Sequence, residues 1–209
     1  MKKIPVILAA LLIALSFSAC RKAGGKAPLI PEAKGGESTE ENYKIPEPAP
    51  EPAKLNVKMS VIGDIMVHSY QYEEAYDKAS KTYDFSHNFT DVKKYFDASD
   101  ITVGNLETVF AGEEAGIGDY PMFNTPDAFA AALKDAGIDL LTTANNHCMD
   151  RGKNGLLRTI DILDGLGIDH VGTYKSKEDG NAILVKEING ISFAFLSYTY
   201  GTNGLPGPE

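Results

Sequence analysis

Short apolar runs alternate with amphipathic stretches from about residue 55 onward. The first run, residues 55–67, is broken by Gly63-Asp64. Three further runs lie at 101–103, 138–143 and 168–171, and two amphipathic stretches lie at 128–136 and 156–166. Short apolar runs bounded by turn residues are typical of strands, and apolar residues three or four apart are typical of helices. Strands that alternate with helices predict an α/β fold with a mainly parallel sheet covered by helices.

Local signals define several elements more closely. Phe89, Val92 and Phe96 form an i, i+3, i+7 stripe that predicts a helix. Thr125-Pro126-Asp127 places a cap, a first-turn proline and an acid in the order expected before the helix at 128–136. Asn189-Gly190 joins two apolar runs, which predicts a β-hairpin.

Residues 1–19 have the order of a secretory signal peptide. Lys2 and Lys3 precede an apolar run that is shorter than the ~20 residues of a membrane span. Ser-Ala-Cys20 resembles the bacterial lipobox, although Phe17 stands where leucine is usual. We expect Cys20 to be lipidated and to anchor a secreted protein at the outer face of a bacterial membrane. The alternative is an ordinary secretory signal with an incidental cysteine.

Residues 20–54 have the composition of a disordered linker. They are rich in proline, glutamate and lysine, and their charges balance. Such a segment cannot bury enough apolar surface to fold, and its proline-rich end should be extended. We therefore place one folded domain at residues 55–209.

The chain has a formal net charge of −9 and two cysteines. The acidic balance argues against nucleic acid as a partner. Because a lipidated Cys20 cannot form a disulfide, we expect Cys148 to be a small, reduced residue in the packed interior.

Three predicted strands end in polar residues that suit a metal site. These ends carry Asp64, then Asn105 and Glu107, then Asn146 and His147. The carboxyl ends of parallel strands meet at one edge of a sheet, so the five side chains should converge there. Carboxylates, amide oxygens and an imidazole suit a divalent cation, and they can also polarise a phosphate or carbonyl oxygen.

Asp150 and the other histidines leave alternatives open. Asp150 belongs either to the same site or to the cap of the following helix, and Asn145-Asn146 is also good turn material. His68 shares a face with Asp64 if the strand continues, and otherwise lines the rim of the site. We expect His87 on the surface and His170 in a structural role.

Four motifs together resemble the CapA-type proteins of poly-γ-glutamate capsule biosynthesis. They are Gly63-Asp-Ile-Met-Val-His68, Gly104-Asn-Leu-Glu-Thr108, Ala144-Asn-Asn-His-Cys-Met-Asp-Arg-Gly152 with Gly155 and Thr159, and His170-Val-Gly-Thr173. The resemblance spans about residues 58–198, which is most of the predicted domain.

The resemblance implies a fold and a set of site residues. The family is similar to the calcineurin-like metallophosphoesterases, which have a layered α/β/β/α sandwich and a two-metal site. By that similarity, Asp64, Asn105, Glu107 and Asn146 would bind one or two divalent ions of the Mn, Zn, Fe or Mg class. His147 and Asp150 would serve catalysis. Asn105 departs from the family pattern, because a carboxylate usually bridges the metals there.

Two histidine-rich motifs of the family do not occur before Glu209. These are a His-Trp-Gly-type motif and a Gly-His-His-Pro-His-type motif, which supply further metal ligands. We therefore expect this sequence to hold only the N-terminal part of the sandwich. By itself it should bind divalent metal weakly, lack phosphoesterase activity and expose an apolar sheet edge.

Two classes of function remain open. The first is a metal-dependent hydrolase or transferase that acts on a phosphoester or on the γ-glutamyl polymer. The second is a non-catalytic factor that binds the capsule polymer, or membrane partner proteins of capsule synthesis, during assembly or export. The negative charge argues against simple electrostatic binding of a polyanionic polymer.

Overall fold

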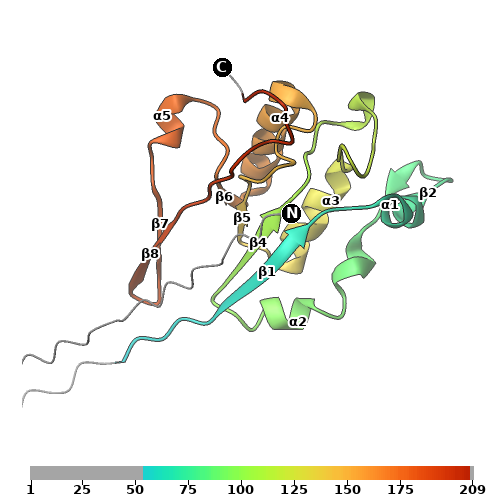
Figure 1. Cartoon of the computed structure of the whole chain (residues 1–209). Helices are drawn as coiled ribbons and strands as arrows, with labels where there is room; N and C mark the ends of the chain where they lie inside the picture. Colours follow the sequence, from blue (N-terminus) through green and yellow to red (C-terminus); the bar gives the residue numbers. More distant parts are fainter. Residues whose placement is uncertain (1–53, 208–209) are drawn as a thin grey trace, which may run out of the picture. The chain divides into compact units, whose positions relative to one another are not determined.

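The computed structural model describes residues 54–207. The signal peptide, Cys20 and nearly all of the linker therefore lie outside the described residues and stay predictions. The centre of the fold is a sheet of four parallel strands, in the order β1 (Met59–Ile65), β4 (Ile101–Leu106), β5 (Leu140–Thr142) and β6 (Asp169–Val171) (Figure 1). The predicted parallel sheet is confirmed.

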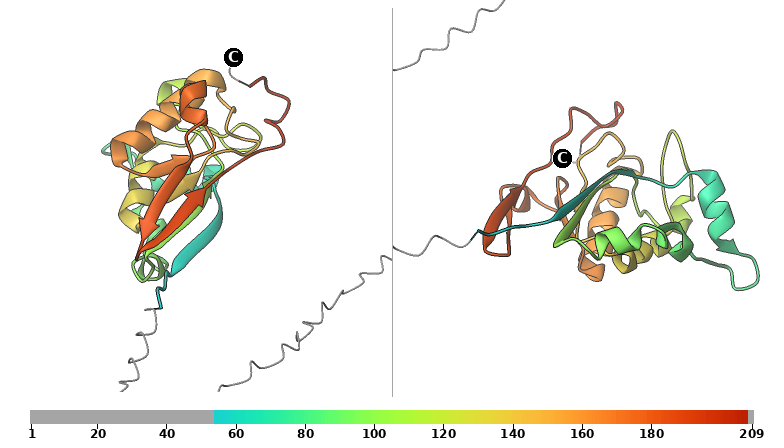
Figure 2. Two further views of the ribbon diagram at one scale, coloured as in Figure 1. Left: turned by 90° about the vertical axis from the view of Figure 1, so that its left-hand side faces the viewer. Right: turned by 90° about the horizontal axis from the view of Figure 1, so that it is seen from below.

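Two helices cover one face of this sheet. They are α3 (Asp127–Ala136) and α4 (Gly152–Leu166), and Figure 2 shows them together on one side of the strands. Their buried residues Leu133 and Leu163 pack with Leu141 of β5 in the main apolar core. Both helices end at a glycine with positive φ, Gly137 and Gly167, as the sequence predicted.

A β-hairpin covers the opposite face. Strands β7 (Leu184–Ile188) and β8 (Ile191–Phe195) are joined by Asn189 and Gly190, both at positive φ, as a two-residue hairpin turn requires. Leu184, Ile188 and Phe195 pack on a second apolar cluster formed by Ile101, Val103, Leu140 and Val171 of the parallel strands. Helices, parallel sheet and hairpin thus form an α/β sandwich, which confirms the predicted fold class.

The remaining elements are short. They are α1 (Ser69–Ala75), β2 (Tyr76–Asp77), β3 (Thr82–Tyr83), the 3-10 helices η1 (Ser86–Phe89) and η2 (Glu113–Ala115), α2 (Lys93–Phe96) and α5 (Lys177–Gly180). Among residues 54–207, no helix is long and apolar enough to cross a membrane.

Two local predictions are wrong. The stripe from Phe89 to Phe96 does not form one helix, because the chain makes tight i→i+3 bonds such as Val92 N to Phe89 O and splits into η1 and α2. Thr125 does not cap α3, whose N-cap is Pro126. The Thr125 hydroxyl instead lies 2.8 Å from that of Thr108, and both residues are buried.

Candidate functional site

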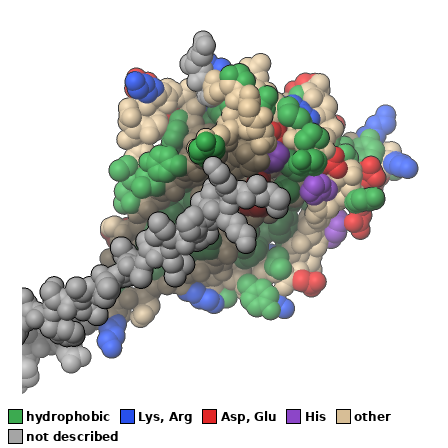
Figure 3. All heavy atoms as spheres, in the orientation of Figure 1, with side chains coloured by type: hydrophobic (Ala, Val, Ile, Leu, Met, Phe, Trp, Pro, Cys, Tyr) green, Lys and Arg blue, Asp and Glu red, His purple; other side chains and the backbone are tan. Residues whose placement is uncertain are grey.

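The pairing of the strands aligns three polar residues across the sheet. Asp64 of β1 lies opposite Asn105 of β4, and Asn105 lies opposite Thr142 of β5. All three stand at or next to the carboxyl ends of their strands, at the edge where the sequence predicted a site. Figure 3 shows histidine and acidic side chains close together on this side of the molecule.

Asn105 joins the two carboxylates of this edge. Its Nδ2 donates to Asp64 Oδ1 and to Glu107 Oε2, both at 2.9 Å. Partial burial, followed by contact with the Asp64 carboxylate, raises the pKa of Glu107, and nearby His147 opposes that rise. The structure therefore brings Asp64, Asn105 and Glu107 together and places His147 within electrostatic reach.

Asn145 fixes the loop between β5 and α4 against β4. Its Nδ2 donates to Leu106 O at 2.7 Å and to Asn105 Oδ1 at 3.1 Å, and its Oδ1 accepts from His147 N at 3.0 Å. The sequence alone did not identify Asn145 as part of the site. The Asn145-Asn146 pair was a visible signal, but which amide turns inward depends on the path of the chain after the strand.

His147 and Asp150 form a buried pair. His147 Nδ1 lies 2.7 Å from Asp150 Oδ2, and the two residues are 6% and 1% exposed. Phe123 N donates to the same carboxylate oxygen at 2.7 Å. The alternative that Asp150 caps α4 is wrong, since the N-cap is Arg151 and Asp150 points to the imidazole. With Nδ1 bound in this way, Nε2 is the ring atom left to meet a substrate or a metal.

His68 stands at the rim, beyond the end of β1. It is the N-cap of α1, and its half-exposed side chain lies 3.9 Å from the Asp119 carboxylate. The rings of His68 and Phe123 are in T-shaped contact, with their centroids 5.3 Å apart. The rings of Phe123 and His147 are also in T-shaped contact, with their centroids 4.7 Å apart. The alternative of a strand that continues through His68 is wrong, because β1 ends at Ile65. No sequence pattern identified Phe123.

The other predicted residues lie elsewhere. Asn146 donates to Asn203 at 3.2 Å, so its amide turns toward the segment after the hairpin, and its role as a metal ligand stays a prediction. His87 is exposed on η1, and His170 pairs with Asp164 at 3.0 Å. Cys148 is buried and free, and burial raises the pKa of its thiol, which fits a packing role.

The donor groups fit a hard divalent cation only in part. Asp64 and Glu107 supply carboxylate oxygens, which such ions prefer. Within residues 54–207, no three His, Cys, Asp or Glu side chains are arranged to hold a metal ion. The Asn105 carboxamide oxygen already accepts from Asn145 and, at 3.3 Å, from Thr142. This donor set by itself favours weak binding.

A cavity of about 670 Å³ adjoins the loop that carries His147. Cys148, Met149 and Leu156 form its apolar part, and Thr173 and Lys177 are among its polar residues. It offers room for an extended ligand, but neither His147 nor Asp150 lines it.

The sequence of this domain matches a known family over almost its whole length. Residues 58–208 match the model described as "Bacterial capsule synthesis protein PGA_cap". The chain belongs to this capsule synthesis family. The resemblance inferred from its four motifs is therefore confirmed.

Individual relatives agree with this assignment. The chain is 29% identical over 147 residues to the "Capsule biosynthesis protein CapA" of Bacillus anthracis, covering 68% of this chain and 34% of the relative. It is 30% identical over 147 residues to the "PGA biosynthesis protein CapA" of Bacillus subtilis, covering 67% and 36%. An uncharacterized protein of Sinorhizobium fredii is 30% identical over 154 residues, covering 66% and 29%. The chain thus spans about a third of the length of these relatives.

Proposed function

We propose that this capsule synthesis family member carries out metal-dependent hydrolysis or transfer at a phosphoester or γ-glutamyl bond of a surface polymer. The observation that carries the proposal is the buried His147–Asp150 pair beside the carboxylates of Asp64 and Glu107. Burial of such a pair has a desolvation cost, and the raised pKa of Glu107 nearby is the kind of perturbation that functional sites often show.

The residues have distinct roles in this proposal. Asp64 and Glu107 would hold a divalent ion of the Mn, Zn, Fe or Mg class, with Asn146 as a further ligand. Such an ion supplies Lewis acidity toward the bond that breaks and lowers the pKa of a bound water. Asp150 accepts from Nδ1–H of His147, which leaves Nε2 to face the substrate; once Nε2 has taken a proton from the attacking water, it can pass that proton to the leaving oxygen or nitrogen. Asn105 keeps the two carboxylates in place through its amide group.

The location of the protein belongs to the same proposal. Lipidation of Cys20 after removal of residues 1–19 would hold the domain at the outer face of a bacterial membrane, at the end of the linker 20–54. The partners would be the capsule polymer and membrane proteins of capsule synthesis. The names of the two CapA relatives, which refer to capsule and PGA biosynthesis, support the capsule polymer as a partner.

Measurement of metal binding tests whether Asp64 and Glu107 hold a divalent ion, as the proposal requires. Calorimetric titration with Mn²⁺ should show weak binding to this chain, and Asp64→Asn or Glu107→Gln should lower the affinity roughly tenfold or more by removing a charged ligand. Asp164→Asn is the matched control, because Asp164 pairs with His170 and Lys175 away from the site. Equal affinities for the wild type and all three variants would contradict the proposed metal site.

The second candidate function is a non-catalytic assembly or export factor. It is favoured by the lack of a three-residue His, Cys, Asp or Glu cluster in the part of the chain that the structure describes. A factor of this kind would bind polymer with the same affinity in the presence of a chelator. The enzyme would instead release shorter chains or phosphate-containing products, and a chelator would stop it.

A further inference from the structure

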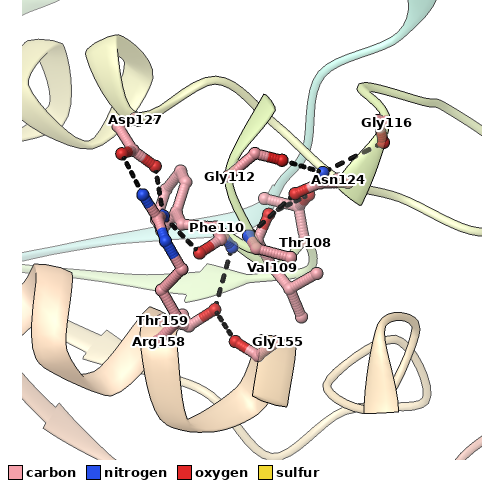
Figure 4. A network of polar contacts seen from close by, with 11 residues as sticks. Thr108, Val109, Phe110, Gly112, Gly116, Asn124, Asp127, Gly155, Arg158 and Thr159 are labelled. Carbon is pink, nitrogen blue, oxygen red and sulfur yellow. Dashed lines mark hydrogen bonds and ion pairs between the residues drawn. The ribbon is translucent and has the colours of Figure 1, made fainter. Parts of the chain in front are cut away.

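In the segment between β4 and α3, the side chain of the buried Asn124 joins parts of the loop that lie apart in the sequence. Asn124 Oδ1 accepts from Ala111 N at 2.8 Å, and its Nδ2 donates to the carbonyls of Gly112 and Gly116 at 2.8 and 3.0 Å (Figure 4). The backbone of Asn124 also pairs with Gly118 in both directions. This side chain is fully buried, and it binds three backbone groups of the segment at once.

Helix α4 holds the same segment from the other side. Thr159 Oγ1 accepts from Phe110 N at 2.8 Å, and Arg158 donates to Phe110 O and to both carboxylate oxygens of Asp127 (Figure 4). Gly155 faces this segment at close range: a Cβ there would lie 3.4 Å from that of Ala111, at the limit of ordinary contact, and would clash with the Cβ of Arg151 at 2.6 Å. The segment therefore offers a rigid support for the residue that precedes Asn124.

That residue, Phe123, lies between two imidazoles. Its ring is nearly perpendicular to the rings of both His147 and His68, at 78° and 80°. Its backbone N–H donates to Asp150 Oδ2, the oxygen that also contacts His147 Nδ1. One residue thus contacts His147 directly through its ring and indirectly through Asp150. Asp119 of the same segment accepts from Ser69 N at 3.0 Å and lies beside His68.

We propose that Phe123 is a positioning residue that fixes His147 and His68 in one mutual orientation at the site. This inference deepens the proposed function. Its catalytic consequence rests on that function, whereas the orientation of the two rings does not. Perpendicular contacts between rings are directional, whereas an aliphatic side chain of similar size fills space without setting the angle of a neighbour. The ring contacts restrict rotation of the two imidazoles, and the N–H bond holds the carboxylate that selects the His147 tautomer.

Imidazole nitrogen spectra of the full chain test this directly. The sequence has only four histidines, so selective ¹⁵N-histidine labelling gives a simple spectrum that reports the tautomer of each ring at one fixed pH. Phe123→Leu removes the ring and keeps the backbone N–H. Phe129→Leu is the matched control, because Phe129 is equally buried and contacts the rings of Phe85 and Phe89. Phe123→Met serves if the leucine variant does not fold.

The wild type should show His147 as a single Nδ1–H tautomer. In Phe123→Leu, the His147 and His68 signals should average between tautomers or broaden, and Phe129→Leu should keep both unchanged at a similar loss of stability. In the whole protein, hydrolysis of bis(p-nitrophenyl) phosphate with Mn²⁺ should lose about 10- to 100-fold in kcat with a smaller change in KM. An unchanged His147 tautomer in Phe123→Leu, or the same change in Phe129→Leu, overturns the role of Phe123. An inactive wild type contradicts the proposed function, and the spectra still decide the role of Phe123.

Discussion

Asn105 Nδ2 lies 2.9 Å from Asp64 Oδ1 and forms an equal bond with Glu107. The amide thus donates to two carboxylates that repel each other at the strand ends. Changing Asn105 to aspartate should replace a shared donor by a third negative charge. The metal-free variant should melt a few degrees lower than the wild type, and Mn²⁺ should restore more of the melting temperature than it adds to the wild type.

Thermal unfolding with and without Mn²⁺ checks this prediction. Asn88→Asp is the control, because it makes the same change at an exposed residue of η1 that has no role in the proposed site. A melting temperature for Asn105→Asp equal to that of the wild type, with no added response to Mn²⁺, would show that Asn105 does not organise the pair.

The buried hydroxyl of Thr159 should matter for stability. It accepts from Phe110 N and donates to Gly155 O, both at 2.8 Å. Thr159→Val keeps the shape and leaves the Phe110 N–H without its partner, which should lower the free energy of unfolding by about 1–3 kcal/mol. Thr159→Ser retains the hydroxyl and should lose less. Chemical denaturation measures both variants, and equal losses would rule out a role for the hydrogen bond.

Asp100 should make the fold sensitive to acid. Its carboxylate accepts from Lys58 N at 2.6 Å, and this bond together with Asn189 holds its pKa below the ordinary value of 3.8. Because the folded-state pKa is the lower one, the charged form adds stability above the unfolded value, and that stability is lost as the pH falls through the folded value. Asp100→Asn should therefore lose less stability than the wild type between pH 5 and about pH 2.

Denaturation at several pH values checks the Asp100 prediction. The exposed Asp91 provides the control variant, Asp91→Asn, which should follow the wild type. If Asp100→Asn lost stability with acid as steeply as the wild type, another carboxylate would have to account for the effect.

Sequence patterns predicted the layers of this fold and the part of the site that lies at the strand ends. Gly137, Gly167 and Asn189-Gly190 mark ends and turns that depend on local backbone geometry alone, and these predictions are confirmed. The convergence of Asp64, Asn105 and Glu107 followed from the parallel sheet, since strand register aligns residues without knowledge of side-chain packing.

The parts that sequence could not predict depend on long-range packing. Phe123 contacts His147 from a segment that Asn124 holds together by hydrogen bonds to distant backbone groups. No periodic sequence pattern predicts that arrangement. The choice between Asn145 and Asn146 as the inward amide depends on the turn after β5. Thr125 has the features of a helix cap, yet its hydroxyl is used by Thr108 in the interior.

Cys20 should decide where the protein is found. Cys20→Ala should abolish incorporation of a labelled fatty acid and shift the protein out of the membrane fraction, because the lipid chains would be its anchor. Cys148→Ala should keep both properties, since that thiol is buried in the domain. Retention of label and membrane location in the Cys20 variant would refute the lipoprotein prediction.

The most direct test of the proposed catalysis compares three histidine variants of the whole protein. Bis(p-nitrophenyl) phosphate hydrolysis with Mn²⁺ is measured for His147→Ala, His87→Ala and His170→Ala. His147 alone pairs with Asp150 beside the carboxylates, so its loss should reduce kcat about 100-fold or more, as removal of a transition-state contact does. The other two variants should stay within about twofold of the wild type, since exposed His87 and the His170–Asp164 pair lie outside the site. Equal, small effects of all three changes would contradict the catalytic account and favour the assembly factor.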